Sequence, residues 1–510
     1  SLAGEIPRPA LGDVIAGSSV ALVLIPQSLA YAEIAGVPPH VGLFASALPP
    51  LLAAPFASSP YLQTGPVALT SLLTFGALSG LEATGTAEYV QLAALLALVV
   101  GVTRLVLGLV QMGAIAYLMS QPVLVGFTSA AAVLIISSQV PAMFGVFPDE
   151  DDVLARAWSV VTDPAAWDAT AVTLSVITVA VVLGSRRVHQ LLPGVLIVVI
   201  AAVVWSEAVD HTGAEVGDLP GGFITLSLDL PYGDIGSLIV PGIVIALVGF
   251  AEPASIARTF ATADRIPWSA NRELVSQGVA NLASGISGAF PVGGSFSRSS
   301  LNRLAGARSI WSGAITGAVV LVLVPLAPLL EELPRAVLGA IVFSAVYKLF
   351  QPIEMVRMFV ASRVQGAVAI GTFVATLVSS PNVERGVIAG VVFAVAAHLY
   401  RELRVDHAHE LDGDTLVLRP AGVVWFATTP QLERRFIAAM AEHPDVDRLR
   451  IDFEHVGRFD YSGAVTLATL VDDACNAGVE VTIVNIPPHA SRALAAHLGG
   501  RCGVPTLDEL

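Results

Sequence analysis

Apolar stretches long enough to enter a bilayer recur through the first 400 residues of this 510-residue chain, and they limit its fold more than any other feature. A membrane-spanning helix needs roughly 20 mostly apolar residues. Residues 1–400 hold 40 of the 67 Asp, Glu, Lys and Arg residues, which is 10% of that stretch, whereas residues 401–510 hold the other 27, which is 25%. The sequence therefore predicts a membrane-embedded region followed by a small soluble domain. This pattern excludes an ordinary cytosolic enzyme.

Fourteen apolar segments can be placed in the membrane region. They lie at about residues 12–19, 40–57, 65–80, 89–112, 113–140, 167–184, 191–209, 235–257, 268–290, 294–305, 308–330, 335–350, 364–380 and 386–400. Lys and Arg are retained on the cytoplasmic side of a membrane. With the N-terminus inside, the most basic loops fall inside: those with Arg186 and Arg187, with Arg258, Arg265 and Arg272, and with Lys348, Arg357 and Arg363. We expect a multi-pass protein of the inner (plasma) membrane whose N-terminus and tail are cytoplasmic.

Charge and cysteine content exclude several partners. The net charge is −15 and the isoelectric point is about 5.0, and no basic tract opposes this, so we expect no binding to nucleic acid. Two cysteines, Cys475 and Cys502, are too few for a disulfide framework or a zinc site. We therefore expect no metal and no cofactor.

Three apolar segments are unusual for transmembrane helices. The apolar stretch around the first, from Asp13 to Ala30, contains Pro26, which removes a backbone donor, and we expect the helix to break there. The third runs from Pro66 to Ser79, and these 14 residues span only about 21 Å, short of a hydrocarbon core of roughly 30 Å. The tenth opens at Gly293 and is shorter still. We expect the last two to be half-helices that end at the membrane midplane.

These interruptions recur at equal spacing in the two halves of the membrane region. Pro66 follows Pro26 by 40 residues, Gly293 follows Pro253 by 40 residues, and the two pairs are offset by 227 residues. Interrupted segments at matching places in two halves point to the substrate site of a transporter. The alternative is that apolar helices tolerate Gly and Pro and that the equal spacing is chance.

Two half-helices that meet at their N-termini favour a bound anion. Their N–H groups and positive dipole ends converge on one place. Ser295 and Ser297 add hydroxyl donors there, and Arg298 adds a positive charge at membrane depth, where such a charge is costly. The alternative for Arg298 is a structural pairing with a carboxylate such as Glu252.

Glu33 and Glu252 are the acidic residues nearest the interrupted helices, and either could carry a proton. The alternative for Glu33 is an interfacial carboxylate at the end of the first helix. The alternative for Glu252 is an acceptor for backbone donors freed near Pro253. Gln27 could donate to the anion or satisfy the backbone near Pro26.

Several ordered motifs carry a resemblance to a known family. They are IPQSLAYAEIAGVPP at residues 25–39, TGPVA at 64–68, GFAE at 249–252 with IAR at 256–258, and GSFSRS at 294–299. These motifs span most of the first 400 residues. The chain resembles the sulfate permease (SulP) family of anion transporters, which includes pendrin and prestin.

The resemblance implies a polytopic α-helical membrane protein with seven plus seven inverted transmembrane helices, a core and a gate domain, elevator-like alternating access and a homodimer. Bacterial members carry sulfate, bicarbonate or dicarboxylates such as fumarate and succinate, driven by protons or sodium. Pro253 departs from the family pattern, and Glu252 and Ser255 are the only obvious oxygen donors there, which favours proton over sodium coupling. The implied site is lined by Gln27, Glu33, Gly65, Pro66, Val67, Ala68, Glu252, Ser295, Phe296, Ser297 and Arg298.

The tail has the alternating strands and helices of a small α/β domain. We expect a transmembrane domain over residues 1–404 and a soluble domain over residues 411–510. The loop Asp460 to Gly463 resembles that of STAS domains, in which the serine before the glycine can be phosphorylated. Here Ser462 is interpreted first as a helix N-cap, with a regulatory role as the alternative. The resemblance implies regulation, folding or targeting of the carrier, not enzymatic activity.

The sequence therefore predicts a secondary active anion transporter, and proton-coupled symport of a small anion is the first hypothesis for its mechanism. One alternative is an uncoupled anion channel or exchanger of the same fold. A second is a nucleobase carrier, against which Arg298 and the tail argue. A third, from another class, is a membrane-anchored signalling protein whose tail is the active part.

Overall fold

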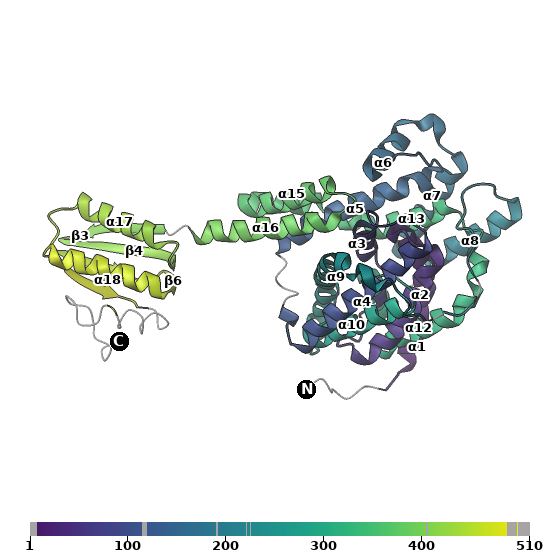
Figure 1. The fold of residues 1–510 in the computed structure, drawn as a ribbon, viewed down its shortest axis with the longest axis horizontal. Coiled ribbons are helices and arrows are strands. Elements are labelled where there is room, and N and C mark those ends of the chain that lie inside the picture. The colour runs from purple at the N-terminus through teal and green to yellow at the C-terminus, as the bar shows by residue number, and fades with distance from the viewer. Residues whose placement is uncertain are drawn as a thin grey trace. The chain divides into compact units, whose positions relative to one another are not determined.

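The structure is a computed structural model that describes residues 8–114, 120–189, 192–220, 222–224, 226–403, 406–486 and 497. The chain divides into two compact units, Ser1–Ala394 and Val395–Leu510. The first is helical, and the second combines a β-sheet with helices (Figure 1). The predicted domain limits at residues 404 and 411 lie slightly beyond this division, and they stay a prediction.

The first unit is built from helices and two very short strands. Its N-terminal part contains α1 (Leu11–Ala35), α2 (Pro39–Ala53), η1 (Ala54–Phe56), β1 (Thr64–Gly65), α3 (Ala68–Leu78), α4 (Ala87–Leu109), α5 (Gln121–Phe144), α6 (Val153–Thr162), η3 (Pro164–Ala166), α7 (Ala169–Val188) and α8 (Gly194–Val209), where η denotes a 3-10 helix. It continues with η4 (Tyr232–Asp234), α9 (Ile235–Asp264), α10 (Ala270–Ile286), β2 (Gly293–Gly294), α11 (Phe296–Leu304), α12 (Trp311–Leu323), η5 (Val324–Leu330), α13 (Arg335–Val346), η6 (Tyr347–Leu349), α14 (Pro352–Ala361), α15 (Arg363–Val378) and α16 (Val383–Glu402), whose last eight residues belong to the second unit.

Each of the fourteen predicted segments overlaps a helix of this unit. Seven helical stretches in the described part of the chain are long and apolar enough to cross a membrane, judged by length and composition: Leu11–Ala35, Ala87–Leu109, Gln121–Phe144, Tyr232–Asp264, Trp311–Leu330, Arg335–Ala361 and Val383–Glu402. The sequence analysis missed α6 and α14. Both have 10 residues and bury few side chains, so they lack the long apolar signature of a span.

The predicted break at Pro26 is wrong. Helix α1 has 25 residues and runs through Pro26, and α9 likewise runs through Pro253. A proline removes one backbone donor from a helix, and the remaining hydrogen bonds and the packing of neighbouring helices hold the rest. Near Pro26, the Ser28 hydroxyl also donates to the Ile25 carbonyl at 2.6 Å.

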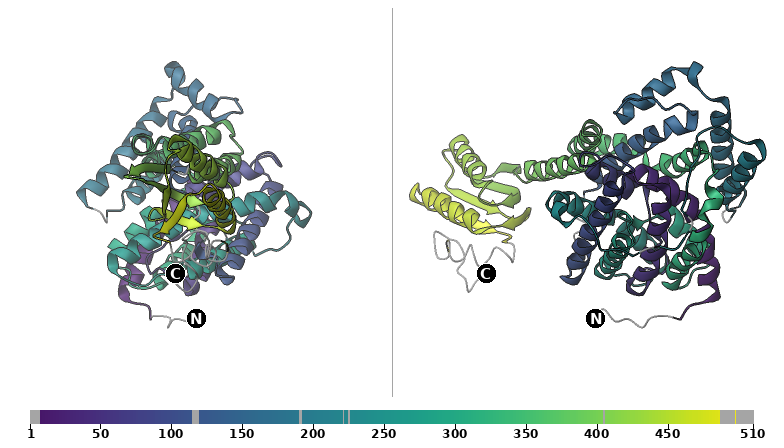
Figure 2. Two further views of the ribbon diagram at one scale, coloured as in Figure 1. Left: turned by 90° about the vertical axis from the view of Figure 1, so that its left-hand side faces the viewer. Right: turned by 45° about the vertical axis from the view of Figure 1, so that its right-hand side comes forward.

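The predicted repeat is confirmed by the order of the elements. The order α1, α2, β1, α3, α4 in the first half matches α9, α10, β2, α11, α12 in the second, and α1 and α9 each contain a proline. Strands β1 and β2 pair antiparallel, with Thr64 opposite Gly294 and Gly65 opposite Gly293. Antiparallel pairing fits two repeats of inverted topology. Helices of both halves are interleaved, as the purple and teal ribbons in Figure 2 show.

Helices α4 and α10 approach closely through glycines. A Cβ at Gly278 would lie 2.7 Å from the backbone nitrogen of Leu105, and a Cβ at Gly101 would lie 2.7 Å from that of Leu282. Membrane helices approach this closely where small residues meet. This close packing fixes the position of α10, whose polar residues hold β1 and β2.

Gly278→Leu is expected to prevent correct packing of the membrane unit. The new side chain would collide with backbone that cannot move aside, at a cost above the ~1–3 kcal/mol typical of overpacking. Size-exclusion chromatography and thermal unfolding of detergent-purified protein would measure this. Gly313→Leu is the matched control, because a Cβ at this helical glycine has no neighbour within 4 Å. Equal stability of the two variants would contradict the prediction.

In the part of the second unit that the structure describes, a mixed sheet is accompanied by helices α17 (Thr429–Glu442) and α18 (Tyr461–Asn476). The sheet contains β3 (Asp406–Asp412), β4 (Thr415–Val424), β5 (Arg448–Asp452), β6 (Val456–Phe459) and β7 (Glu480–Val484). The strand order is β3-β4-β5-β7, and β6 pairs with β4. Strand β3 is antiparallel to β4, whereas β4, β5 and β7 run parallel. The alternation of strands and helices predicted from the sequence is confirmed.

The N-cap of α18 is Asp460, and the interpretation of Ser462 as the N-cap is wrong. The Asp460 carboxylate accepts from the Gly463 N–H at 2.7 Å and from the Phe426 N–H at 3.2 Å. Ser462 is the second residue of the helix and is partly exposed. Its regulatory role stays a prediction.

Asp460→Ala is expected to loosen the start of α18 by about 0.5–2 kcal/mol, the usual cost of losing an N-cap. Hydrogen exchange of the amides in residues 461–470, measured in the full-length protein, should accelerate accordingly. Ser462→Ala should leave these amides unchanged, since Ser462 caps nothing. Equal acceleration in both variants would contradict this assignment.

Candidate functional site

Two half-helices begin where the repeats meet. Helices α3 and α11 have 11 and 9 residues, or about 16 and 14 Å, so neither crosses a bilayer core, as predicted. Their N-cap residues, Val67 and Ser295, make no side-chain cap hydrogen bond. Both helices begin within three residues of the β1–β2 pair, which brings their positive ends together. The four predicted residues around the start of α3 are all buried: Gly65, Pro66, Val67 and Ala68.

Amide side chains from α10 hold the strand pair. Gln277 Nε2 donates to Thr64 Oγ1 at 2.7 Å. The Asn281 side chain accepts from the Val292 N–H at 3.0 Å and donates to the Val292 carbonyl at 3.1 Å. The sequence analysis missed both residues. Their signal was an amide pair four residues apart, and therefore on one face of the helix.

Arg104 is a second buried cation that the sequence analysis missed. Its side chain is 0% exposed and donates to three carbonyls, those of Ile245 at 3.2 Å, Ala246 at 3.1 Å and Val292 at 3.0 Å. Gly249 gives the guanidinium room, since a Cβ there would lie 2.6 Å from Arg104 Nη2. The signal was a single arginine inside an apolar 23-residue helix. Arg104 thus ties α9 to the segment that enters β2.

Arg298 is 1% exposed and lies at the junction of the half-helices. Its Nη2 donates to the Pro66 carbonyl at 2.8 Å, whereas Nε and Nη1 have no hydrogen-bond partner among the described residues. The charge of Arg298 interacts with Tyr31 and Glu252. Within the described part of the chain, no carboxylate forms a direct ion pair with Arg298 or with Arg104. The junction therefore carries buried positive charge and free donors.

Glu252 lies in the middle of α9, beside the start of α11. Its carboxylate interacts with the backbone N–H of Phe296 and with the charge of Arg298. This contact is compatible with the structural alternative of an acceptor for backbone donors. The next residue, Pro253, explains a glycine in β2, because a Cβ at Gly294 would lie 3.1 Å from the Pro253 ring.

Gln27 lies on the face of α1 that meets the junction. It is 2% exposed, and its Oε1 has no hydrogen-bond partner among the residues that the structure describes. One turn earlier, Leu24 lies 3.6 Å from a Cβ placed at Gly65, and one turn later Tyr31 interacts with Arg298. Side chains three and four residues apart share a helix face, so Gln27 faces the same region. Tyr31 belongs to the motif at residues 25–39 but was not predicted as a site residue.

Glu33 has a different environment. Its Oε1 lies 3.7 Å from Nε of Arg335, at the start of α13, and this Nε also donates to the Glu215 carbonyl at 2.9 Å. The Glu33 side chain is 23% exposed, and its Oε1 is buried without a hydrogen-bond partner among the described residues, so the alternative of an interfacial carboxylate also stays a prediction. A role for Glu33 in proton transfer stays a prediction.

The remaining predicted residues lie in the first turn of α11. The hydroxyls of Ser295 and Ser297 are 3.3 Å apart, and the Ser295 N–H donates to the Gln63 carbonyl at 3.1 Å. Phe296 is 54% exposed, and its ring stacks on that of Phe260 with centroids 6.1 Å apart. The structure thus gathers Gln27, Glu252, Arg298 and the two half-helix starts in one region.

The fold and this junction define a polytopic helical membrane protein with a pair of half-helices that begin beside the β1–β2 pair. Residues 11–399 match the sulfate permease family, and residues 407–497 match the STAS domain. The chain belongs to the sulfate permease family, a family of transporters, and carries a C-terminal STAS domain.

Two relatives illustrate the similarity in sequence. A probable sulfate transporter of Mycobacterium tuberculosis is 36% identical over 407 residues, which cover 78% of this chain and 71% of the relative. Solute carrier family 26 member 6 of Homo sapiens is 31% identical over 415 residues, which cover 76% of this chain and 54% of that protein.

Two solved structures share the fold. The murine solute carrier 26 family member A9 anion transporter, in its inward-facing state, has a TM-score of 0.88 at 19% identity, covering 99% of this chain and 91% of that one. The transmembrane domain of the cyanobacterial bicarbonate transporter BicA has a TM-score of 0.63 at 21% identity, covering 76% of this chain and 97% of that one.

Proposed function

We propose that this protein is a secondary active transporter of a small anion, bound between the starts of α3 and α11. The proposal rests on one observation: Arg298 is buried, and its Nε and Nη1 lack a hydrogen-bond partner among the described residues. Buried donors of this kind are rarely left unpaired, and a helix N-terminus is a natural anion site. An oxyanion would satisfy the guanidinium and the first-turn N–H groups together.

The names of the relatives narrow the choice of candidate anions. Those similar in sequence include probable sulfate transporters, and one solved structure of this fold belongs to a bicarbonate transporter. Sulfate is a tetrahedral oxyanion, whereas bicarbonate and the carboxylates of dicarboxylates are planar, and the oxygens of each can accept hydrogen bonds from a guanidinium. Sulfate is the first substrate to test, because the relatives named for it reach 36% identity.

Proton coupling is assigned to Glu252 rather than to Glu33. A carboxyl group at membrane depth is a natural proton carrier. Glu252 interacts with Arg298 and with the α11 N-terminus, so its charge competes with the anion for the same donors. Neutralising Glu252 by a proton would free these donors, which links proton binding to anion binding.

The remaining features of the proposal concern orientation and assembly. The N-terminus and STAS domain face the cytoplasm of a plasma-membrane protein, as the distribution of Lys and Arg favours. The two half-helices move with the anion in an elevator-like step, and the protein works as a homodimer. Support for both comes from the family alone.

Uptake into liposomes tests the proposal. Purified protein is reconstituted, and radiolabelled sulfate, bicarbonate, succinate and fumarate are offered with and without an inward proton gradient. Accumulation of one anion only with the gradient is the expected result. Uptake regardless of the gradient would indicate a channel or exchanger, and no uptake above protein-free liposomes would contradict anion transport. Removing residues 411–510 should leave some uptake, whereas a signalling protein would lose its function outright.

A further inference from the structure

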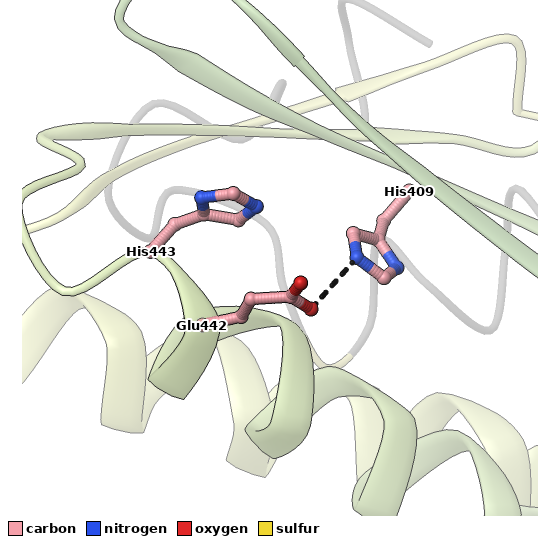
Figure 3. Close-up of side chains that lie close together, drawn as sticks. All are labelled: His409, Glu442 and His443. Carbon is pink, nitrogen blue, oxygen red and sulfur yellow. Dashed lines mark hydrogen bonds and ion pairs between the residues drawn. The ribbon is translucent and has the colours of Figure 1, made fainter.

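Three potential metal ligands meet in the STAS domain, outside the proposed transport site. They are His409 on β3, Glu442 at the end of α17, and His443, which follows it. Their ligand atoms all lie within 4.8 Å of one another. Figure 3 shows the two imidazole rings on either side of the Glu442 carboxylate, facing one space.

The fold itself brings these side chains together. Strand β3 begins the sheet and pairs with β4, with His409 opposite Leu418. Helix α17 ends at Glu442, and the backbone of His443 has left the helical region, with φ −127° and ψ 68°. His409 Nε2 lies 3.2 Å from Glu442 Oε2, and the two imidazole centroids are 6.1 Å apart.

We propose that His409, Glu442 and His443 bind one Zn²⁺ ion. Two imidazoles and one carboxylate are a ligand set that zinc accepts, with the fourth position open to water or another ligand. Zinc bonds of about 2.0–2.1 Å in a tetrahedron place neighbouring ligand atoms roughly 3.3 Å apart. The separation of 3.2 Å between His409 Nε2 and Glu442 Oε2 already fits. The ligand atom of His443 lies within 4.8 Å of the other two and would move closer on binding the ion. Calcium and magnesium prefer sites made only of oxygen ligands, which this site is not.

A cavity beside the cluster provides the fourth position. Its volume is about 110 Å³, and its lining includes His409, Glu442, Arg419 and Arg435. Two neutral imidazoles and one carboxylate leave a bound Zn²⁺ with a charge of +1. A hydroxide or another small anion would complete the tetrahedron.

The sequence analysis expected no metal because it relied on cysteine content. The ligands here are imidazoles and a carboxylate, and His409 is 33 residues from Glu442, so no short motif announces them. A bound ion would connect the first strand of the STAS domain to the end of α17 and would replace the His409–Glu442 hydrogen bond.

Zinc binding by tag-free, full-length protein in detergent tests this inference. Competition with a chromophoric zinc chelator gives the affinity and stoichiometry, and Co²⁺ loading reports geometry, since tetrahedral Co²⁺ has intense visible bands and octahedral Co²⁺ weak ones. We expect one ion per chain with tetrahedral bands. His409→Ala, Glu442→Gln and His443→Ala should each weaken binding at least tenfold.

His455→Ala is the matched control, because it removes an exposed histidine of the same domain outside the cluster. It should bind Zn²⁺ like the natural protein. Size-exclusion profiles establish that each variant is folded, and should His409→Ala fail, His443→Ala at the helix end carries the test. Unchanged affinity in folded cluster variants, octahedral Co²⁺ spectra, or equal loss in His455→Ala would overturn the assignment.

Discussion

Replacing Arg298 by alanine is expected to abolish anion uptake while leaving the protein folded. The guanidinium supplies buried charge and N–H donors at the junction. Its Nε and Nη1 have no hydrogen-bond partner among the described residues, so both are available to an anion, and alanine has no such donors. Removing one partner of a buried, hydrogen-bonded charge pair, here the guanidinium that would face the bound anion, costs roughly 2–5 kcal/mol. This corresponds to a loss of at least about thirty-fold in affinity for the anion. The measurement is initial uptake of labelled anion into liposomes at several concentrations.

Arg303→Ala is the matched control on the same helix. Arg303 is partly exposed, and its Nε donates to the Asp264 carboxylate at 3.0 Å, at the far end of α11. Uptake by this variant should stay within about twofold of the natural protein, since exposed ion pairs contribute little. Normal uptake by monodisperse Arg298→Ala protein would contradict the proposed anion site.

Replacing Glu252 by glutamine is expected to remove the dependence of uptake on a proton gradient. Glutamine keeps the size of the side chain but cannot exchange a proton. With the proton relay lost, the ratio of uptake with an inward gradient to uptake without it should fall to about one. Liposomes prepared at matched and at different internal and external pH values measure this ratio.

Glu33→Gln separates the two candidate carboxylates. Glu33 lies 3.7 Å from Arg335, so its loss should disturb a contact between α1 and α13 and leave the gradient dependence intact. A Glu33→Gln variant that loses this dependence, beside a Glu252→Gln variant that keeps it, would reverse the assignment. If both lose it, the coupling requires both groups.

The sequence was sufficient for the half-helices because their signal is local. Pro66 and Gly293 open segments too short for a bilayer, and their spacing from Pro26 and Pro253 is equal. The break at Pro26 was predicted wrongly because a missing donor was equated with a broken helix. Packing around α1 is a property of the whole unit, and no local pattern reports it.

Tertiary partners explain what the sequence could not supply. Arg104 is visible as an arginine in an apolar stretch, but the three carbonyls that accept its hydrogen bonds lie more than 140 residues later. Glu33 and Glu252 were equivalent candidates in the sequence, and their partners in the fold distinguish them. Glu33 lies beside Arg335, whereas Glu252 interacts with Arg298 and the Phe296 N–H. Asp460 rather than Ser462 is the N-cap because α18 begins at Tyr461, earlier than the interpretation of Ser462 required. The additional hydrogen bond from the Phe426 N–H comes from a distant segment.

The pairing of β1 with β2 has a consequence for biogenesis. Thr64 and Gly294 are 230 residues apart, and at about 5–20 residues per second a ribosome needs roughly 11 to 46 s to connect them. During that interval the first half-helix has been synthesised without its partner strand, although a bilayer penalises unpaired backbone groups. The junction of the two half-helices is therefore completed only after more than half of the 510 residues have been synthesised. Until then, we expect the insertion machinery or neighbouring helices to cover the unpaired backbone of the first repeat.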